Sequence, residues 1–180
     1  MKRNHLRILA LLLCIILPLS ACAETAAPEA EPDSTPNLIE LLNEYTTLDL
    51  TPYLGKTVIV NFFTEWCTYC MQEMPDFRKV NDLYNPDQLQ MVLVHVWDGE
   101  DETATETVKA RFGMEDMVFF EDTDRMVASV VGLMGYPATI IVEPDGELAY
   151  AVNSMVTEEW LTTALDEMDV KRMEETNEPV

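Results

Sequence analysis

The feature that most constrains this sequence is a pair of cysteines set between a buried strand and a helix. Residues 57–63, TVIVNFF, form an unbroken β-branched and aromatic run, which is typical of a strand buried on both faces. Cys67 and Cys70 follow this run, and the pattern of residues 71–84 predicts a helix. We therefore expect both cysteines at the junction where a central strand ends and a helix begins.

Strand and helix patterns alternate along the rest of the chain. The predicted helices are 37–45, 71–84, 102–113, 124–133 and 157–168. The predicted strands are 46–50, 57–63, 89–97 and 117–122, followed by two strands within 138–152 that a Pro-Asp-Gly turn joins. This alternation predicts an α/β fold with a central mixed sheet, helices on both faces and a C-terminal antiparallel hairpin that adds an edge.

The N-terminus has the pattern of an export signal. Basic residues precede the apolar run 8–17, which is too short for a helix to cross a hydrocarbon core of about 30 Å. Leu19-Ser20-Ala21-Cys22 resembles the lipobox of bacterial lipoproteins, in which the cysteine receives a diacylglyceryl group. We therefore predict a removed signal peptide over 1–21 and a lipid at Cys22 that anchors the protein outside the cytoplasm on the bacterial cell membrane. An ordinary signal peptide with a chance cysteine and an uncleaved anchor are the alternatives.

Composition divides the remainder of the chain. Residues 22–36 are predicted to be the lipidated Cys22 and a flexible acidic tether, because Pro, Ala and Glu without large apolar residues cannot form a core. One domain over 37–170 and a charged tail over 171–180 follow. Removing the signal peptide takes away three basic and no acidic residues, so the formal charge falls from −22 to −25. Such a charge argues against nucleic acid and against electrostatic docking on anionic lipid.

Two cysteines at this spacing can serve a metal site, a structural disulfide or a redox cycle. A zinc site needs four ligands, but the mature chain offers only Cys67, Cys70 and His95, so no metal is predicted. An inert disulfide across two intervening residues would close almost no loop and would stabilise little. A redox pair is favoured, and the helix N-terminus would favour a thiolate on the first cysteine.

The segments FFTEWCTYCMQEMP and GYPATIIVEPDGEL, together with the element order, resemble the thioredoxin superfamily. Within it the chain is most similar to the membrane-tethered, extracytoplasmic reductases of the ResA and TlpA type. The resemblance implies a thioredoxin-like fold and the activity of a thiol–disulfide oxidoreductase. It also implies that Cys67 is the nucleophile and Cys70 the resolving thiol.

The resemblance assigns further residues to the site. Trp66, Tyr136 and Pro137 match substrate-binding positions, and the Tyr136–Pro137 peptide bond is expected to be cis. Glu73 matches a glutamate of the ResA and TlpA branch and is a candidate proton relay, although it can also be a plain carboxylate on a helix surface. Asn61 stands where cytoplasmic thioredoxins carry a buried aspartate.

The resemblance also implies partners but no cofactor. It suggests a disulfide-containing protein substrate, such as apocytochrome c, a methionine sulfoxide reductase or a spore-envelope protein. A membrane thiol-electron donor of the CcdA/DsbD type would restore the dithiol. We expect a reductant, because Thr68 and Tyr69 between the cysteines carry no positive charge and Glu65 and Glu73 flank the pair. The expected potential lies on the reducing side of roughly −200 mV.

Two other functions remain open. A Sco-like copper-binding and delivery module would use His95, although that family places three residues between its cysteines, where this chain has two. A peroxiredoxin-like thiol peroxidase is suggested by Thr64-x-x-Cys67. Its motif also has a proline four residues before the threonine, where this chain has Val60.

Overall fold

The computed structural model describes residues 37–99 and 103–173. The predicted signal peptide (1–21), Cys22 and the tether (22–36) lie outside the described residues, as do residues 174–180 of the predicted tail. Within the two described ranges no helix has the length and apolar character needed to cross a membrane.

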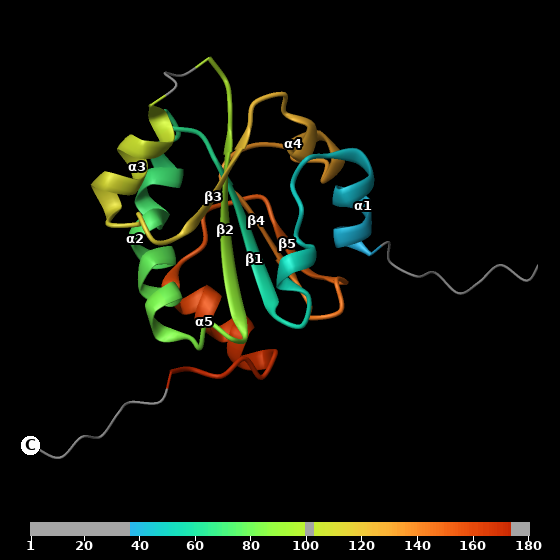
Figure 1. Cartoon of the computed structure of the whole chain (residues 1–180). Coiled ribbons are helices and arrows are strands. Elements are labelled where there is room, and N and C mark those ends of the chain that lie inside the picture. The colour runs from blue at the N-terminus through green and yellow to red at the C-terminus, as the bar shows by residue number, and fades with distance from the viewer. Residues whose placement is uncertain (1–36, 100–102, 174–180) are drawn as a thin grey trace, which may run out of the picture. The chain divides into compact units, whose positions relative to one another are not determined.

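The domain is built on one five-stranded mixed sheet. Its strands are β1 (Thr57–Phe63), β2 (Leu89–Val96), β3 (Val118–Asp122), β4 (Ala138–Val142) and β5 (Leu148–Val152). They lie in the order β3-β2-β1-β4-β5, with β1, β2 and β3 parallel (Figure 1). β4 runs antiparallel to both β1 and β5. The predicted α/β fold with a mixed sheet and a C-terminal hairpin is therefore confirmed. The hairpin does not simply add an edge, because β4 lies inside the sheet beside β1.

Helices cover both faces of the sheet. They are α1 (Leu38–Tyr45), α2 (Thr68–Leu83), α3 (Ala104–Phe112), α4 (Met126–Val130) and α5 (Glu158–Glu167), with a short 3₁₀ turn η1 (Thr51–Tyr53). α2, α3 and α5 lie on one side of the sheet, and α1 and α4 lie on the other (Figure 1). Burial on both faces explains why the sequence of β1 is a continuous apolar run, since every residue of β1 is buried.

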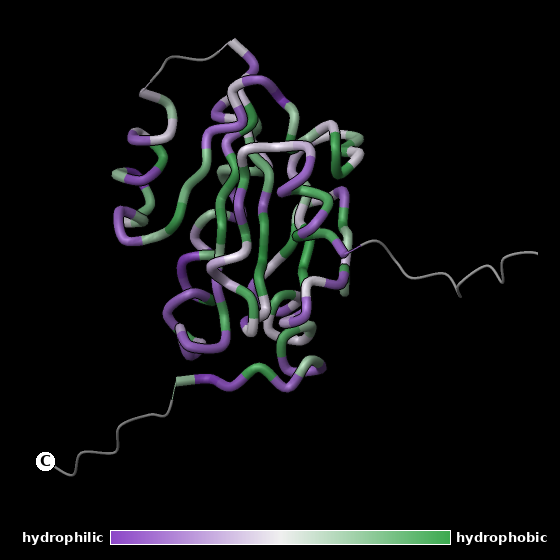
Figure 2. Tube along the Cα trace, turned by 45° about the vertical axis from the view of Figure 1, so that its right-hand side comes forward, coloured by the Kyte–Doolittle hydropathy of each residue, from purple (hydrophilic) through white to green (hydrophobic). Residues whose placement is uncertain are grey.

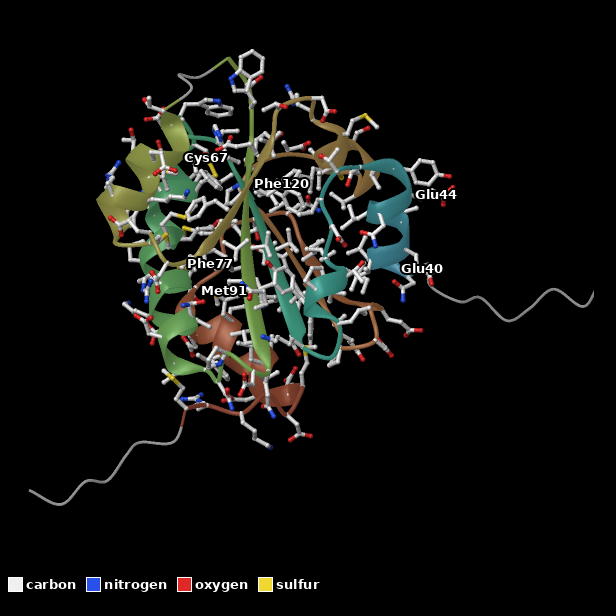
Figure 3. The ribbon with its side chains drawn as sticks, viewed as in Figure 1. Glu40, Glu44, Cys67, Phe77, Met91 and Phe120 are labelled. Atoms are coloured by element: carbon white, nitrogen blue, oxygen red, sulfur yellow. A yellow bond between two sulfur atoms is a disulfide. The ribbon has the colours of Figure 1, made fainter. Side chains whose placement is uncertain are left out.

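The sheet separates two hydrophobic cores. Ile59, Met91 and Phe77 belong to the core under α2 and α5, and Leu42 and Phe62 belong to the core under α1 and α4. Figure 2 shows apolar colour along the central strands, and Figure 3 shows Phe77 and Met91 on the α2 side. Glu40 and Glu44 on α1 are exposed. We call these the α2-side core and the α1-side core.

The predicted strand at 46–50 is wrong. Thr46 ends α1, and both its N–H and its hydroxyl donate to the carbonyl of Leu42 at 2.8 Å. The N–H of Leu48 donates to Thr46 Oγ1 at 3.1 Å. Leu48 and Leu50 are buried in the α1-side core, which produces the alternating pattern. The segment therefore packs against the sheet without pairing with a strand.

Several element boundaries differ from those predicted. α2 begins at Thr68, three residues earlier than predicted, and α4 has only five residues. The folded part of the chain also continues past residue 170. Met173 N–H donates to the carbonyl of Leu83 at 2.9 Å, and Arg172 forms an isolated antiparallel bridge with Tyr84.

The loop between β4 and β5 is fixed against the start of α1. Gly146 has φ +95°, and a Cβ atom there would lie 2.6 Å from Asn37 Oδ1. The Leu38 N–H donates to the carbonyl of Gly146 at 2.9 Å. The Asn37 side chain donates to the carbonyl of Asp145 and accepts from the N–H of Glu40. The backbone angle therefore favours the glycine of the predicted Pro-Asp-Gly turn, and a larger residue there would also displace the Asn37 side chain.

Candidate active site

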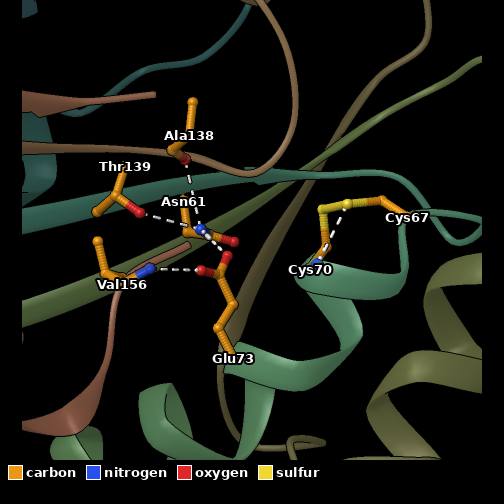
Figure 4. Close-up of a disulfide and its surroundings, with 7 residues drawn as sticks. All are labelled: Asn61, Cys67, Cys70, Glu73, Ala138, Thr139 and Val156. Carbon is orange, nitrogen blue, oxygen red and sulfur yellow. Dashed lines mark hydrogen bonds between the residues drawn. A yellow bond between two sulfur atoms is a disulfide. The ribbon is translucent and has the colours of Figure 1, made fainter. Parts of the chain in front are cut away.

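Cys67 and Cys70 form a disulfide at the N-terminus of α2, with their Cα atoms 5.2 Å apart (Figure 4). Cys67 is the N-cap residue of the helix, and its Sγ accepts a hydrogen bond from the Cys70 N–H at 3.1 Å. Cys70 is fully buried, and Cys67 is 5% exposed. A helix N-terminus presents unpaired N–H groups and the positive end of the helix dipole, so this position stabilises negative charge on the Cys67 sulfur.

Aromatic residues lie beside this pair at the edge of the sheet. Trp66 is exposed, and its ring meets that of Tyr136 edge-on, with centroids 6.4 Å apart. The Tyr136–Pro137 peptide bond is cis. Because Phe62 pairs with Ala138, Pro137 lies at the same edge as the residues that follow β1. The fold thus brings the two motifs on which the resemblance depends to one edge of the sheet.

Glu73 is buried inside the domain, one turn beyond Cys70 in α2. Its side chain is 1% exposed. One carboxylate oxygen, Oε1, accepts a hydrogen bond from Asn61 Nδ2 at 2.7 Å, and Oε2 accepts from the Val156 N–H at 3.1 Å (Figure 4). The alternative of a plain carboxylate on the helix surface is therefore excluded.

Asn61 links this carboxylate to the strand that follows Pro137. Its Nδ2 lies 3.3 Å from the carbonyl oxygen of Ala138 and 3.1 Å from Thr139 Oγ1 (Figure 4). Asn61 Oδ1 is buried and has no hydrogen-bond partner among the described residues. One amide group therefore joins β1, β4 and the Glu73 carboxylate.

The burial of Glu73 changes its acidity. Loss of hydration raises the pKa of Glu73 from 4.5 to about 7, and the charge of Asp76 acts in the same direction. The hydrogen bonds from Val156 and Asn61 lower the pKa, but their effect is smaller than that of burial. Glu73 can therefore take up or release a proton near neutral pH, one helical turn from Cys70.

His95 lies in β2 and is 2% exposed. Its Nδ1 is 2.8 Å from Glu121 Oε2, and its ring lies 5.2 Å from that of Phe63. The Glu121 carboxylate also accepts a hydrogen bond from the Thr105 hydroxyl. In the part of the chain that the structure describes, no group of three or more His, Cys, Asp or Glu side chains has the arrangement of a metal site.

Some groups that shape the site carry no recognisable signal in the sequence. The Val156 contact comes from a backbone N–H, which carries no residue-specific signal. Asp122 is buried at the end of β3, and its carboxylate accepts from the N–H groups of Val127 at 3.0 Å and Ala128 at 2.9 Å. Asp122 thereby fixes the start of α4 at the edge of the sheet where β1, β2 and β3 end, which we call the active-site edge. In the sequence it is one acidic residue among several.

The mixed sheet and the cysteine pair at the start of α2 define a protein of the thioredoxin superfamily. Residues 29–151 match the AhpC/TSA family, and the chain belongs to that family. A solved structure with the same fold is a secreted disulfide oxidoreductase of Mycobacterium tuberculosis. It has a TM-score of 0.58 at 19% identity, over 67% of this chain and 87% of that one.

Relatives with a similar sequence carry the name thiol-disulfide oxidoreductase ResA. The protein of that name from Geobacillus thermodenitrificans is 28% identical over 61% of this chain and 62% of its own length. The one from Bacillus subtilis is 26% identical over 72% of this chain and 70% of its own length. The chain thus spans less than two thirds of the Geobacillus relative. The expected similarity to ResA-type proteins within the thioredoxin superfamily is therefore confirmed.

Proposed function

We propose that this chain is an extracytoplasmic thiol–disulfide oxidoreductase that reduces disulfides in partner proteins through Cys67 and Cys70. The observation that carries the proposal is the position of Cys67, whose sulfur caps α2 and accepts a hydrogen bond from the Cys70 N–H. The similarity to proteins named thiol-disulfide oxidoreductase supports it. Trp66, Tyr136 and Pro137 at the same edge would contact the substrate chain.

The reaction transfers two electrons from the protein dithiol to the partner disulfide. The Cys67 thiolate attacks one sulfur of the partner, so a mixed disulfide forms and one partner thiolate leaves. The Cys70 thiolate then attacks Cys67, which forms the 67–70 disulfide and releases the second partner thiolate. The partner sulfurs finally carry the two protons that the protein thiols lose.

We propose that Glu73 assists the second attack. Cys70 is buried and must lose its proton before its sulfur can act as a nucleophile. A carboxylate with a pKa of about 7, one turn away on the same helix, has the proton affinity suited to accept that proton near neutral pH. We assign Glu73 the role of proton relay, with Asn61 and the Val156 N–H fixing its position.

The direction of electron flow is proposed to be reduction of the partner. Strong oxidants of this class hold the first cysteine as a very stable thiolate, which favours their reduced form. Here Thr68 and Tyr69 offer no positive charge, and Glu65 adds a negative charge beside the pair. The helix N-terminus favours the thiolate, but the Glu65 carboxylate opposes it. We therefore propose a potential on the reducing side of roughly −200 mV.

The proposed location is the outer side of the cell membrane. A lipid at Cys22 and the tether 22–36 would hold the domain near the bilayer, where a membrane dithiol donor of the CcdA/DsbD type could restore the reduced pair. Apocytochrome c, a methionine sulfoxide reductase or a spore-envelope protein are the substrates that the ResA-like resemblance suggests. Labelling with radioactive palmitate that is lost in Cys22→Ser would support the anchor.

A trapping experiment tests the proposed reaction. Cys70→Ser removes the resolving thiol, so the partner should remain attached to Cys67 as a mixed disulfide that dithiothreitol releases. The matched control is Cys67→Ser, in which no adduct should form. Adducts of equal amount in both variants would refute the assignment of Cys67 as the nucleophile.

The two alternative functions have separate tests. In a copper-delivery module, His95→Ala would abolish tight Cu(I) binding, but the His95 imidazole is buried and engaged with Glu121. A thiol peroxidase would react rapidly with peroxide and form a sulfenic acid at Cys67. Either result would replace disulfide reduction as the primary function.

A further inference from the structure

The active-site edge carries a surface of large apolar side chains that the proposed chemistry does not require. The five exposed members of this surface are Trp66, Tyr69, Trp97, Met126 and Met134. Met134 is 89% exposed and Tyr69 is 62% exposed. Exposed aromatic and methionine side chains that gather in one region mark an interaction surface rather than scattered surface residues. We call this set the apolar rim.

The topology brings the members of the apolar rim to the same edge. Trp66 and Tyr69 follow β1, Trp97 follows β2, Met126 follows β3, and Met134 precedes β4. Because β1, β2 and β3 are parallel and β4 is antiparallel to β1, these positions share the carboxyl edge of the sheet.

Contacts connect the two ends of the apolar rim. The Tyr136 ring meets the Trp66 ring, and Arg125, the residue before α4, lies near Tyr136. Burial raises the pKa of Tyr136, and the nearby Arg125 guanidinium opposes that rise. Arg125 in turn pairs with Asp98, which follows Trp97, at 3.0 Å. These contacts connect Trp66, Tyr136, Arg125 and Asp98 along the edge that carries the apolar rim.

The charges around the apolar rim are mainly negative. Glu65, Asp98 and Asp124 lie in the segments that follow β1, β2 and β3. Arg125 is the only Lys or Arg among the described residues of these segments and of the segment 131–137 before β4. Its charge is already engaged with Asp98. A polypeptide with positive charge is the occupant that complements this surface, whereas anionic lipid and a second acidic copy of this chain would be repelled.

The exposure of the cysteines limits the shape of the occupant. Cys67 is almost completely buried, while Trp66, Tyr69 and Met134 are exposed at the same edge of the sheet. A sulfur that reaches Cys67 must therefore lie on a protruding or unfolded segment of the partner, which brings its neighbouring residues against these side chains.

We propose that the apolar rim and its carboxylates select substrates in which lysine or arginine residues and an apolar residue flank the disulfide on a protruding or unfolded segment. This inference rests on the proposed function and names the substrate class of the same site. Tyr69 and Met134 supply apolar contact to the segment, and Glu65 and Asp124 attract its positive charge.

The test compares three disulfide substrates of the reduced full chain. Two are synthetic peptides with the same disulfide and the same apolar residue, flanked by lysines in one and by glutamates in the other. The third is the neutral bis(2-hydroxyethyl) disulfide, which serves as the reference. At low ionic strength we expect the lysine peptide to be reduced about ten-fold faster than the glutamate peptide. At about 1 M salt the Debye length is only about 3 Å, so the electrostatic attraction is screened and this difference in rate should largely disappear.

Variants test the apolar part of the surface. Met134→Ser should lower the ratio of the rate constants for the lysine peptide and the neutral disulfide by about three-fold or more, because an anchoring apolar contact is lost. Leu54→Ser is the matched control, since Leu54 is also an exposed apolar residue but lies before β1 at the opposite edge. It should leave the ratio unchanged. The double variant Glu65→Gln/Asp124→Asn should bring the rates for the two peptides together.

Distinct outcomes separate this inference from the proposed function. Equal rates for both peptides at low salt, or equal effects of Met134→Ser and Leu54→Ser, would overturn the inference while leaving disulfide reduction intact. Failure to reduce any of the three substrates would overturn the proposed function and the inference with it. Sedimentation that reveals a dimer which Met134→Ser dissociates would assign the surface to a second copy and would also overturn the inference.

Discussion

The two cores on either side of the sheet differ in chemistry. The α1-side core is formed by apolar side chains from α1, α4 and the strands. The α2-side core contains the Cys67–Cys70 pair, and Asn61 and Glu73 are buried beside it. Burying polar groups is costly unless they are paired, and most of the polar atoms here do have partners. The comparison indicates that one face mainly stabilises the domain while the other combines stability with chemistry.

β1 shows this difference within a single strand. Val58, Val60 and Phe62 belong to the α1-side core, and Ile59 and Phe63 belong to the α2-side core. Asn61 alternates with them on the α2 side and donates to Glu73. Each residue of β1 therefore serves one face only, so substitutions along this strand can separate stability from redox chemistry.

The largest expected effect is on the α2 side. Cys67→Ser should abolish disulfide reduction, because serine cannot form the mixed disulfide. Serine oxygen is also a good helix N-cap, so the fold should be retained. Loss of turnover in an insulin-reduction assay with unchanged far-ultraviolet circular dichroism would meet this expectation. Residual turnover above that of the Cys67→Ser/Cys70→Ser double variant would contradict it.

The next largest effects are expected for truncations in the two hydrophobic cores. Leu42→Ala removes a fully buried side chain from the α1-side core and should lower the free energy of unfolding by about 2–5 kcal/mol. The rate of thiol–disulfide exchange at low temperature should stay the same. Met74→Ala, an equally buried change in the α2-side core, should alter both quantities. Urea unfolding measures the stability of each variant, and stopped-flow kinetics measure its rate of thiol–disulfide exchange. Equal effects of both variants on the exchange rate would contradict the proposed difference between the two cores.

Glu73 should make the stability of the domain depend on pH. Its pKa is raised from 4.5 to about 7, so the folded state binds this proton more tightly than the unfolded chain does. Its contribution to stability is therefore fully present below pH 4.5 and is lost as the pH rises through about 7. The full change corresponds to about 3 kcal/mol.

Glu73→Gln tests this dependence. In wild type the free energy of unfolding should fall between pH 4.5 and about 7 as Glu73 ionises. In Glu73→Gln, urea unfolding across the same pH range should lack this contribution. Glu115→Gln, which changes an exposed carboxylate, is the control and should retain the wild-type slope. Parallel curves for wild type and Glu73→Gln would show that the proton affinity of Glu73 is not altered by folding.

The smallest expected effects concern the helix caps on the two faces. Thr157 Oγ1 accepts from the Trp160 N–H at the start of α5, and Thr157→Ala should cost about 1 kcal/mol. Asn37 caps α1 and also donates to the carbonyl of Asp145. Asn37→Ala should therefore cost at least as much. Thermal unfolding measures the stability of both variants. A larger loss of stability for Thr157→Ala than for Asn37→Ala would contradict a stabilising contribution from the contact between Asn37 and Asp145.

Much of the fold could be predicted because its signals are local. The apolar run of β1, the Pro-Asp-Gly turn and the Thr157 cap are each encoded within a few residues. The start of α2 was missed by three residues because a cysteine sulfur acts as the cap, a role usually filled by side-chain oxygen. Residues 46–50 alternate as a strand does, yet their pattern reflects packing on the α1-side core.

The active site was predictable in part for the same reason. The cysteine motif is a local signal, and the resemblance supplied Glu73, Tyr136 and Pro137. The burial of Glu73 depends on contacts with Asn61 and with the Val156 N–H, which lie 12 and 83 residues away in sequence. No pattern around Glu73 distinguishes it from an exposed helical glutamate, so its raised pKa emerges only from the assembled structure.

The contact between Val156 and Glu73 has a consequence for biosynthesis. The carboxylate sits on an early helix, but its backbone donor precedes the last helix of the domain. A nascent chain that ends before residue 156 therefore holds both cysteines without the complete polar network beside them. The hydrogen bonds around the Glu73 carboxylate can be completed only after nearly the whole domain has been synthesised, so the raised pKa of Glu73 should be a property of the finished domain.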